Sequence, residues 1–307
     1  MSAKESTWRG APQAELNWTD NGTPSSRPFD DIYYTPDQGL AESRHVFFEG
    51  NSIGHRWLGR DRFTIGETGF GTGLNFLLSW QAWQQDERRP GVLHFLSIEK
   101  YPLTSEDLSR AHLPWHELKQ LSEHLIKRWP CALPGRHRMQ FENGRVVLDL
   151  LIGDALDCWD DFRDESGWQV DAWYLDGFAP SRNEDMWHER LYQGIARLSS
   201  PRATVATFTA AGHVRRGLEA AGFNMEKHPG FGNKREMLQG VRGTSVPRLP
   251  PLKTPWHLPP PPIVEEKTAL VIGAGLAGTS AAAALAKRGW QVTVIDRAEP
   301  GGAASGK

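Results

Sequence analysis

Cysteine is scarce in this sequence. Only two of the 307 residues are cysteines, Cys131 and Cys158, and their spacing fits neither a zinc motif nor a redox pair. The eleven histidines show no H-x-E or H-E-x-x-H spacing, so we expect no metal site. The pattern argues against a disulfide-stabilised secreted domain and favours two reduced thiols in a cytoplasmic protein.

The sequence also lacks an excess of positive charge. It contains 35 Lys and Arg residues against 37 Asp and Glu residues, so overall charge does not indicate a nucleic-acid partner, although a local basic face stays open. The polar N-terminal stretch has no apolar signal region. Residues 268–286 carry no charge over about the length of a membrane span. Because their glycines fall where a strand would turn into a helix, we expect no membrane segment.

The length predicts about two domains. Strands are expected at 62–67, 92–98, 146–152, 170–175 and 203–208, and helices at 73–85, 104–111, 115–128, 185–198 and 211–221. This alternation predicts an α/β, Rossmann-like, doubly wound parallel sheet. Two further strands around Gly230 and Gly232 would add a terminal antiparallel hairpin, an ending common in methyltransferases and rare in dehydrogenases. A proline-rich linker at 246–267 separates a domain at 1–245 from a segment at 268–307, and residues 1–60 are expected to be rich in loops.

The first glycine-rich turn reads Glu67-x-Gly69-x-Gly71-x-Gly73. It differs from the G-x-G-x-x-G spacing of dinucleotide sites, and glycine at alternate positions lets a ligand lie against bare backbone. We expect S-adenosylmethionine there, with Glu67 meeting its cationic amino-acid end. The alternative is a tight strand-helix turn without a ligand.

Acidic residues end three more strands. Glu99 could accept hydrogen bonds from both ribose hydroxyls. Asp154 could reach the adenine amino group or cap the next helix. Asp176 could orient an acceptor amine and take up its proton, or cap a turn, and Phe178 could wall the pocket. Further candidates for the cofactor site are Asn75, Lys100 and Ala155. Pro180 is a further candidate for the substrate pocket.

Basic residues gather late in the chain. Each alone would be a solvated charge, but together on loops at the active edge they could form a rim that contacts tRNA phosphates. The candidates for this rim are Arg182, Arg215, Arg216, Lys234 and Arg235, with Arg136, His137 and Arg138 as further basic positions.

Six stretches carry a resemblance to a known family: FDDIYY, GLAESRHVFFEGN, ETGFGTGLNFL, LDGFAPSRNEDMW, ATFTAAGHVRRGLEAAGF and GFGNKREML. From Asn17 to Gln239 the chain resembles the N-terminal half of the bifunctional tRNA 5-methylaminomethyl-2-thiouridine biosynthesis proteins. The resemblance implies a two-step modification of the tRNA wobble uridine. A C-terminal half removes a carboxymethyl group with FAD, and the N-terminal half methylates the resulting amine from S-adenosylmethionine.

The same resemblance assigns roles to residues. Glu67, the three glycines of the first turn and Glu99 would line the cofactor, with Asp154 near the adenine. Asp176 would face the acceptor amine. The stretch before the fold, with Asp30, Asp31 and Tyr33, would help to close the pocket.

A second glycine-rich turn holds Gly273, Gly275 and Gly278, and Asp296 ends the following strand. This is the pyrophosphate and ribose part of a flavin or NAD site. A segment of about 40 residues can bury only a small core. We therefore expect this truncated βαβ segment to bind no FAD and to perform no oxidation. FAD would be a cofactor of a full-length form only.

Three alternatives to a tRNA N-methyltransferase stay open. One is a dinucleotide-dependent oxidoreductase built around Gly273. Another is a non-catalytic tRNA-binding module with a decayed site, which would have no affinity for S-adenosylmethionine. The last is a methyltransferase whose acceptor is a polyamine or a protein.

Overall fold

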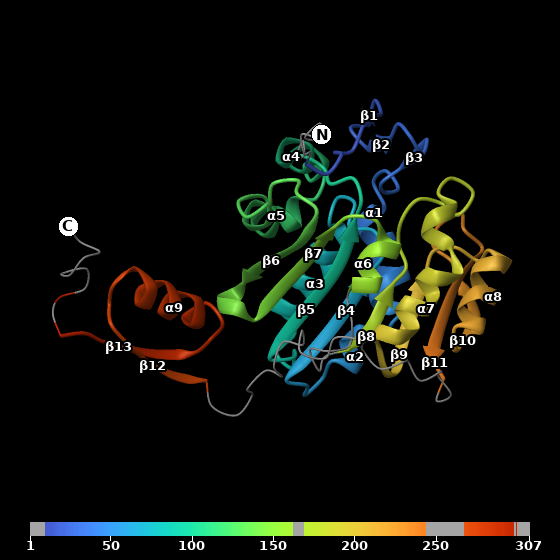
Figure 1. Cartoon of the computed structure of the whole chain (residues 1–307). Coiled ribbons are helices and arrows are strands. Elements are labelled where there is room, and N and C mark those ends of the chain that lie inside the picture. Colours follow the sequence, from blue (N-terminus) through green and yellow to red (C-terminus); the bar gives the residue numbers. More distant parts are fainter. Residues whose placement is uncertain (1–9, 162–168, 244–266, 298, 300–307) are drawn as a thin grey trace, which may run out of the picture.

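The computed structural model describes residues 10–161, 169–243, 267–297 and 299 (Figure 1). Its centre is an eight-stranded sheet in the order β10-β11-β9-β8-β4-β5-β7-β6. The strands are β4 (Arg62–Glu67), β5 (Val92–Glu99), β6 (Gly135–Phe141), β7 (Val146–Ile152), β8 (Val170–Tyr174), β9 (Ser199–Thr207), β10 (Phe223–Pro229) and β11 (Glu236–Arg242). The α/β fold predicted from the sequence is confirmed.

The five middle strands, β9, β8, β4, β5 and β7, run parallel. The chain enters the sheet at β4, passes through β5 to the edge strand β6, and comes back to form β7 between them. It then crosses to the other side of β4 for β8 and β9. This reversal opens a crevice at the carboxyl ends of β4 and its neighbours, which is where open α/β sheets bind ligands. The predicted terminal hairpin is present as β10 and β11, which pair antiparallel.

Helices cover the two faces of the sheet and bury two separate cores. One core packs α3 (Leu74–Gln85) and α5 (Lys119–Ile126) on the sheet and includes the fully buried Phe76 and Trp80. The other packs α7 (Glu189–Leu198) and α8 (Gly212–Ala220), with Tyr192 and Leu218 buried. Each such side chain contributes about 2–3 kcal/mol by leaving water. The remaining helices of this part are α4 (Ser105–Ala111), η2 (His116–Leu118), η3 (Glu142–Gly144), α6 (Ala155–Asp161) and η5 (Glu184–Trp187).

Residues 10–60 contain more regular structure than the sequence suggested. A small antiparallel sheet, β1 (Leu16–Trp18), β2 (Pro24–Ser26) and β3 (Asp31–Ile32), is followed by α1 (Gly39–Ser43), the π-helix η1 (Arg44–Glu49) and α2 (Ile53–Arg56). The strands are too short for a periodic signal. Val46, Phe47, Ile53 and Trp57 are buried in the first core, so this region is part of the folded unit.

Strand β6 was not predicted from the sequence, because its three basic residues at 136–138 are more typical of a loop. Arg136 and Arg138 lie in this edge strand and bind the buried Asp149 of β7. The ion pairs give both arginines a role inside the sheet, whereas a place in a phosphate-contacting rim stays a prediction. Their charge neutralises a carboxylate inside the sheet.

The segment after the linker forms its own two-stranded parallel sheet. Strands β12 (Thr268–Ile272) and β13 (Gln291–Ile295) are joined by α9 (Leu276–Ala286). The uncharged stretch at 268–286 is thus a strand, a turn and an 11-residue helix. In the parts of the chain that the structure describes, every helix is too short or too polar to cross a membrane.

Candidate active site

The first glycine-rich loop joins β4 to α3 at the centre of the sheet. Gly71 and Gly73 have φ values of +53° and +75°, which favour glycine. A Cβ on Gly69 would lie 3.3 Å from the carbonyl oxygen of Asp176, and one on Gly73 would lie 2.6 Å from the ring of Phe70. The three glycines therefore let this loop turn tightly and leave bare backbone beside the end of β8.

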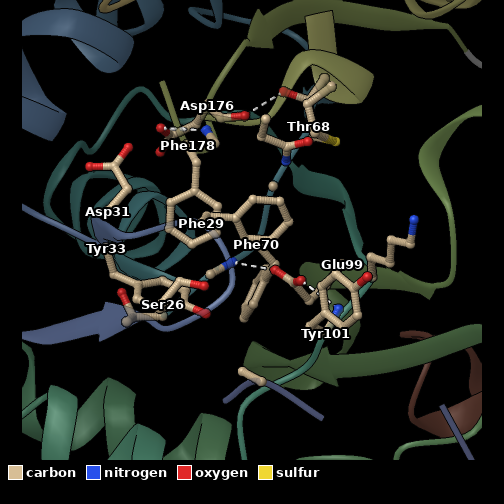
Figure 2. Close-up of a pocket in the computed structure, with 18 of the residues that line it drawn as sticks. Ser26, Phe29, Asp31, Tyr33, Thr68, Phe70, Glu99, Tyr101, Asp176 and Phe178 are labelled. Atoms are coloured by element: carbon tan, nitrogen blue, oxygen red, sulfur yellow. Dashed lines mark hydrogen bonds between the residues drawn. The ribbon is translucent and has the colours of Figure 1, made fainter. Parts of the chain in front are cut away.

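A cavity of about 690 Å³ opens above this loop (Figure 2). That size suits a ligand of nucleoside dimensions. Among the residues singled out in the sequence, twelve line it: Gly69, Gly71, Asn75, Glu99, Lys100, Asp154, Ala155, Asp176, Asp31, Tyr33, Phe178 and Lys234. Segments far apart in the chain thus meet at one place.

Glu99 lies at one end of the cavity. Its carboxylate accepts hydrogen bonds from the backbone N–H groups of Gly71 and Tyr101, both at 2.8 Å (Figure 2). Burial raises the pKa of Glu99, and these backbone donors oppose that rise. These backbone bonds fix the carboxylate, and because a carboxylate offers about four acceptor positions, Glu99 can still accept from neighbouring hydroxyl groups.

Asp154 plays the capping role that was left open. Its Oδ1 accepts from the N–H of Leu156 in the first turn of α6, and its Oδ2 accepts from Lys100 Nζ at 2.8 Å. Although partial burial opposes ionisation, these bonds hold the pKa of Asp154 below its usual value. Both residues also line the cavity, so the cap does not prevent contact with a ligand.

Glu67 lies beneath the cavity and does not line it. Its side chain is fully buried, with Oε1 accepting from Asn75 Nδ2 at 2.9 Å and Oε2 bonded to Ser97 Oγ at 2.6 Å. Burial raises the pKa of Glu67 well above its ordinary value, and Asp176 adds to the rise. Gly73, like Glu67, does not line the cavity, although it belongs to the glycine-rich loop.

Asp176 follows β8 and faces the cavity from the end opposite Glu99 in the view of Figure 2. Its Oδ1 accepts from the N–H of Gly177 at 2.8 Å and its Oδ2 from Asn75 Nδ2 at 2.7 Å. Thr68 Oγ1 donates to its backbone carbonyl at 2.7 Å. Burial raises the pKa of Asp176 to about 6 against these donors. Near neutral pH the group is an anion that readily takes a proton.

Aromatic rings from the N-terminal segment close the cavity. Phe29 stacks on Phe178 with 4.8 Å between ring centroids, and Tyr33 meets Phe178 edge-on at 5.1 Å (Figure 2). Asp31 Oδ2 accepts from the N–H of Ala179 at 2.9 Å, which ties this segment to the loop after β8. Tyr33 also lies over Gly71. The result is an apolar wall between Glu99 and Asp176.

Lys234, in the turn between β10 and β11, stands at the edge of the cavity. Its Nζ lies 2.7 Å from Glu42 Oε1 of α1 and 4.6 Å from the ring centroid of Phe208. A second, more open hollow adjoins the first along Ala179, Phe208 and Lys234. Its other lining residues include Pro180, His213 and Arg235.

The other candidate residues lie away from both hollows. Asp30 pairs with Arg182 at 3.1 Å on exposed surface. Arg215 pairs with Glu219 at 3.9 Å along α8, and Arg216 is exposed on the same helix. Exposed pairs of this kind add little stability. Of the five predicted rim residues, only Lys234 and Arg235 therefore lie beside a hollow.

The second glycine turn has the expected local geometry. Gly273 has a φ of +102°, and a Cβ on Gly278 would lie 1.8 Å from the Gly273 carbonyl oxygen. Asp296 Oδ2 accepts from the N–H of Ala274 at 2.5 Å. Gly275 precedes α9 in extended conformation. The turn matches a nucleotide-binding βαβ unit, while Leu270, Ile272 and Leu276 around it are 60–80% exposed.

Sequence reasoning missed several lining residues, including Phe29, Glu42, Ser43, Tyr101 and Phe208. Three of them, Phe29, Glu42 and Ser43, lie outside the strand ends of the main sheet, where the search for site residues was concentrated. In the described part of the chain, no three His, Cys, Asp or Glu side chains form a group that could hold a metal ion.

Comparison with known proteins agrees with this geometry. Residues 116–243 match the family model described as S-adenosyl-L-methionine-dependent methyltransferase, and residues 268–307 match that of FAD dependent oxidoreductases. The chain is 47% identical, over 92% of its length, to the tRNA 5-methylaminomethyl-2-thiouridine biosynthesis bifunctional protein MnmC of Stutzerimonas stutzeri. It is 49% identical to the protein of that name from Pseudomonas aeruginosa strain UCBPP-PA14, again over 92% of its length. The chain is a relative of the MnmC proteins.

Each alignment covers 43% of the MnmC protein, so the chain spans less than half the length of these relatives. The crystal structure of MNMC2 from Aquifex aeolicus has the same fold. Its TM-score is 0.59 at 20% identity, and the match covers 80% of this chain and 75% of that one. The two family matches imply S-adenosyl-L-methionine for the first unit and FAD for a full-length MnmC protein.

Proposed function

We propose that this chain is an N-methyltransferase that transfers a methyl group from S-adenosyl-L-methionine to the amine of 5-aminomethyl-2-thiouridine at the tRNA wobble position. The observation that carries the proposal is the cavity with Asp176 at one end and Glu99 at the other. The similarity to proteins named for tRNA 5-methylaminomethyl-2-thiouridine biosynthesis supports the tRNA substrate. We expect the chain to act in the cytoplasm.

The residues present fit the cofactor. Glu99 holds two fixed acceptor oxygens at the end of β5, where ribose hydroxyls would be bound, and Gly69 and Gly71 leave room for the ligand against the backbone. Asp154 and Ala155 line the same cavity, with Lys100 bonded to Asp154, and we assign them to the adenine side. When bound, S-adenosyl-L-methionine supplies an electrophilic methyl group on a positively charged sulfur.

Asp176 would handle the acceptor. An amine reacts through a neutral nitrogen lone pair, and an ionised carboxylate can hold its N–H groups and accept the proton that it must lose. Asp176 lines the cavity, while the rings of Phe29, Tyr33 and Phe178 exclude water and offer stacking surface for a base. Lys234 and Arg235 would contact the tRNA phosphates. Both residues line the second hollow, and so does Pro180.

An oxidoreductase that removes the carboxymethyl group is the less favoured alternative. It would use the unit at 268–297 as the beginning of an FAD site in a full-length protein. In the described residues this unit offers a single βαβ turn, with Gly273, Gly275, Gly278 and Asp296 positioned for a pyrophosphate and a ribose.

The acceptor class is tested by offering the chain labelled S-adenosyl-L-methionine with three acceptors in parallel. These are tRNA carrying 5-aminomethyl-2-thiouridine, a polyamine such as spermidine, and a mixture of cytoplasmic proteins. Label only in the tRNA supports the proposal. Label only in the polyamine or protein would replace the acceptor. Absence of both transfer and cofactor binding would indicate a binding module, and cofactor binding without transfer to any of the three would indicate another acceptor.

A further inference from the structure

The amide of Asn75 joins two buried carboxyl groups. Asn75 is the second residue of α3 and is 5% exposed. Its Nδ2 lies 2.9 Å from Glu67 Oε1 and 2.7 Å from Asp176 Oδ2, while the Ser43 hydroxyl is hydrogen-bonded to its Oδ1. Only the nitrogen of an amide can donate to both carboxylates, so this network fixes the orientation of the side chain.

The Asn75 side chain has two N–H donors, and one goes to each carboxylate. The oxygen is occupied by Ser43 of α1. Asn75 also lines the cavity, so its contacts with the two carboxylates add a second role to the expected cofactor contact.

We propose that Asn75 is a positioning residue for methyl transfer: one N–H of its amide donates to Asp176 and holds it ionised and directed at the acceptor amine, while the other anchors the amide on the buried Glu67. The inference rests on the proposed function of Asp176. Oδ2 of Asp176 is held by Asn75 and Oδ1 by the N–H of Gly177, so the remaining lone pairs have one fixed direction.

The charges around Asp176 explain why a donor is needed there. Glu67 approaches from β4 and Glu42 from α1, and Asp31 of β3 binds the N–H of Ala179 in the loop that follows Asp176. Lys234 faces the group from the β10–β11 turn but is shared with Glu42. Burial and Glu42 favour the protonated carboxyl, whereas Gly177, Asn75 and Lys234 favour the anion. Loss of Asn75 removes one of the two donors to the anion.

The test compares Asn75→Leu with the wild-type chain across pH 5–9. Methyl transfer to tRNA carrying 5-aminomethyl-2-thiouridine gives kcat at each pH, and calorimetry gives the Kd of S-adenosylhomocysteine. We expect the acid limb of the kcat profile to move up by about one pH unit, the low end of shifts caused by a lost partner. The Kd should stay within about threefold of the wild-type value.

Two further variants guard against a purely structural effect. Asn51→Leu removes another buried amide, which donates only to the backbone carbonyls of Phe47 and Trp173, and should leave the acid limb in place. Asn75→Ser is smaller and keeps one donor, so it should fold and show an intermediate shift. A uniform loss of kcat at every pH in both Asn75 variants, or an equal shift in Asn51→Leu, would overturn the inference.

A measurement without an acceptor separates this inference from the proposed function. The Asp176 carboxyl carbon is titrated by 13C NMR in wild-type protein and in Asn75→Ser, with its signal assigned through Asp176→Asn. A higher midpoint in Asn75→Ser supports the link even if no tRNA is methylated. An unchanged midpoint refutes it even if methyl transfer is observed.

Discussion

Individual acidic residues carry most of the site, and their positions at strand ends made them visible in the sequence. Glu99, Asp154 and Asp176 all reach the cavity, as expected for carboxyl ends of neighbouring parallel strands. Glu67 was harder to interpret, because its direction depends on Ser97 from β5 and Asn75 from α3. From the sequence one can predict that Glu67 ends a strand, but not whether its side chain lines the cavity or lies beneath it.

Asp176→Ala tests the role of the carboxylate. The variant should lose methyl transfer by a factor of at least about 10², within the range that general acid-base groups contribute. Cofactor affinity should stay within a few-fold, because Glu99 and the glycine loop are untouched. Transfer is measured with labelled S-adenosyl-L-methionine and affinity by calorimetry. A variant that loses cofactor binding instead would remove Asp176 from the acceptor side.

Elements were predicted best where apolar runs are long. Strands β4, β5, β7 and β8 have nearly every residue buried, so their patterns were clear. Strand β6 was not predicted because Arg136 and Arg138 interrupt its apolar pattern. Both arginines bind Asp149 on the adjacent strand β7. A pairing partner eleven or more residues away leaves no periodic signal.

The buried Asp149 should be important for anchoring β6. Its side chain is fully buried and bonded to Arg138, Arg136 and His94. Although burial opposes ionisation, these partners hold the pKa of Asp149 far below its usual range. Its stabilisation is therefore present above the unfolded-state pKa of about 3.9 and is lost as pH falls toward the folded-state pKa.

We expect Asp149→Asn to lower the free energy of unfolding by about 3 kcal/mol at pH 7, the low end for a broken buried pair because the arginines are partly exposed. Urea titrations at pH 7 and below pH 4 check this, and the difference from wild type should shrink in acid. Exposed Asp61→Asn is the control. An equal difference at both pH values would show that the effect is not ionic.

The turn between β10 and β11 should contact tRNA phosphates. Lys234→Ala with Arg235→Ala should weaken tRNA binding and flatten the slope of log affinity against log salt by roughly one unit for each lost contact. The measurement is tRNA binding at several salt concentrations. Lys119→Ala with Lys127→Ala removes the same charge from exposed positions around α5 and should leave the slope unchanged. Equal slopes in wild type and the Lys234 and Arg235 double variant would place the phosphates elsewhere.

At the scale of the whole molecule, composition indicates two units separated by a proline-rich linker, but it does not predict the regular structure of residues 10–60. Phe29, Tyr33 and Asp31 close the cavity only because the N-terminal segment folds back over the loop after β8. Contacts between Asp31 and Ala179 span 148 positions in the chain. Nothing in the local sequence indicates such a pairing.

A chain that ends at residue 243 should remain folded and active. The cavity, both cores and all eight strands of the main sheet lie before this point. The unit at 268–297 leaves large apolar side chains exposed and includes no residue of the cavity. Cofactor affinity and kcat of the shortened chain should match the longer chain within about twofold. A loss of cofactor binding would show that residues after 243 complete the site.

The most direct measurement compares two tRNAs under the same conditions with S-adenosyl-L-methionine. One carries 5-aminomethyl-2-thiouridine and the other its carboxymethylated precursor, and the modified nucleosides are identified by mass after digestion. The account predicts a mass gain of one methyl group on the first tRNA and an unchanged precursor on the second. Methylation of neither, with cofactor still bound, would contradict the claim that Asp176 and this cavity serve a wobble-uridine amine.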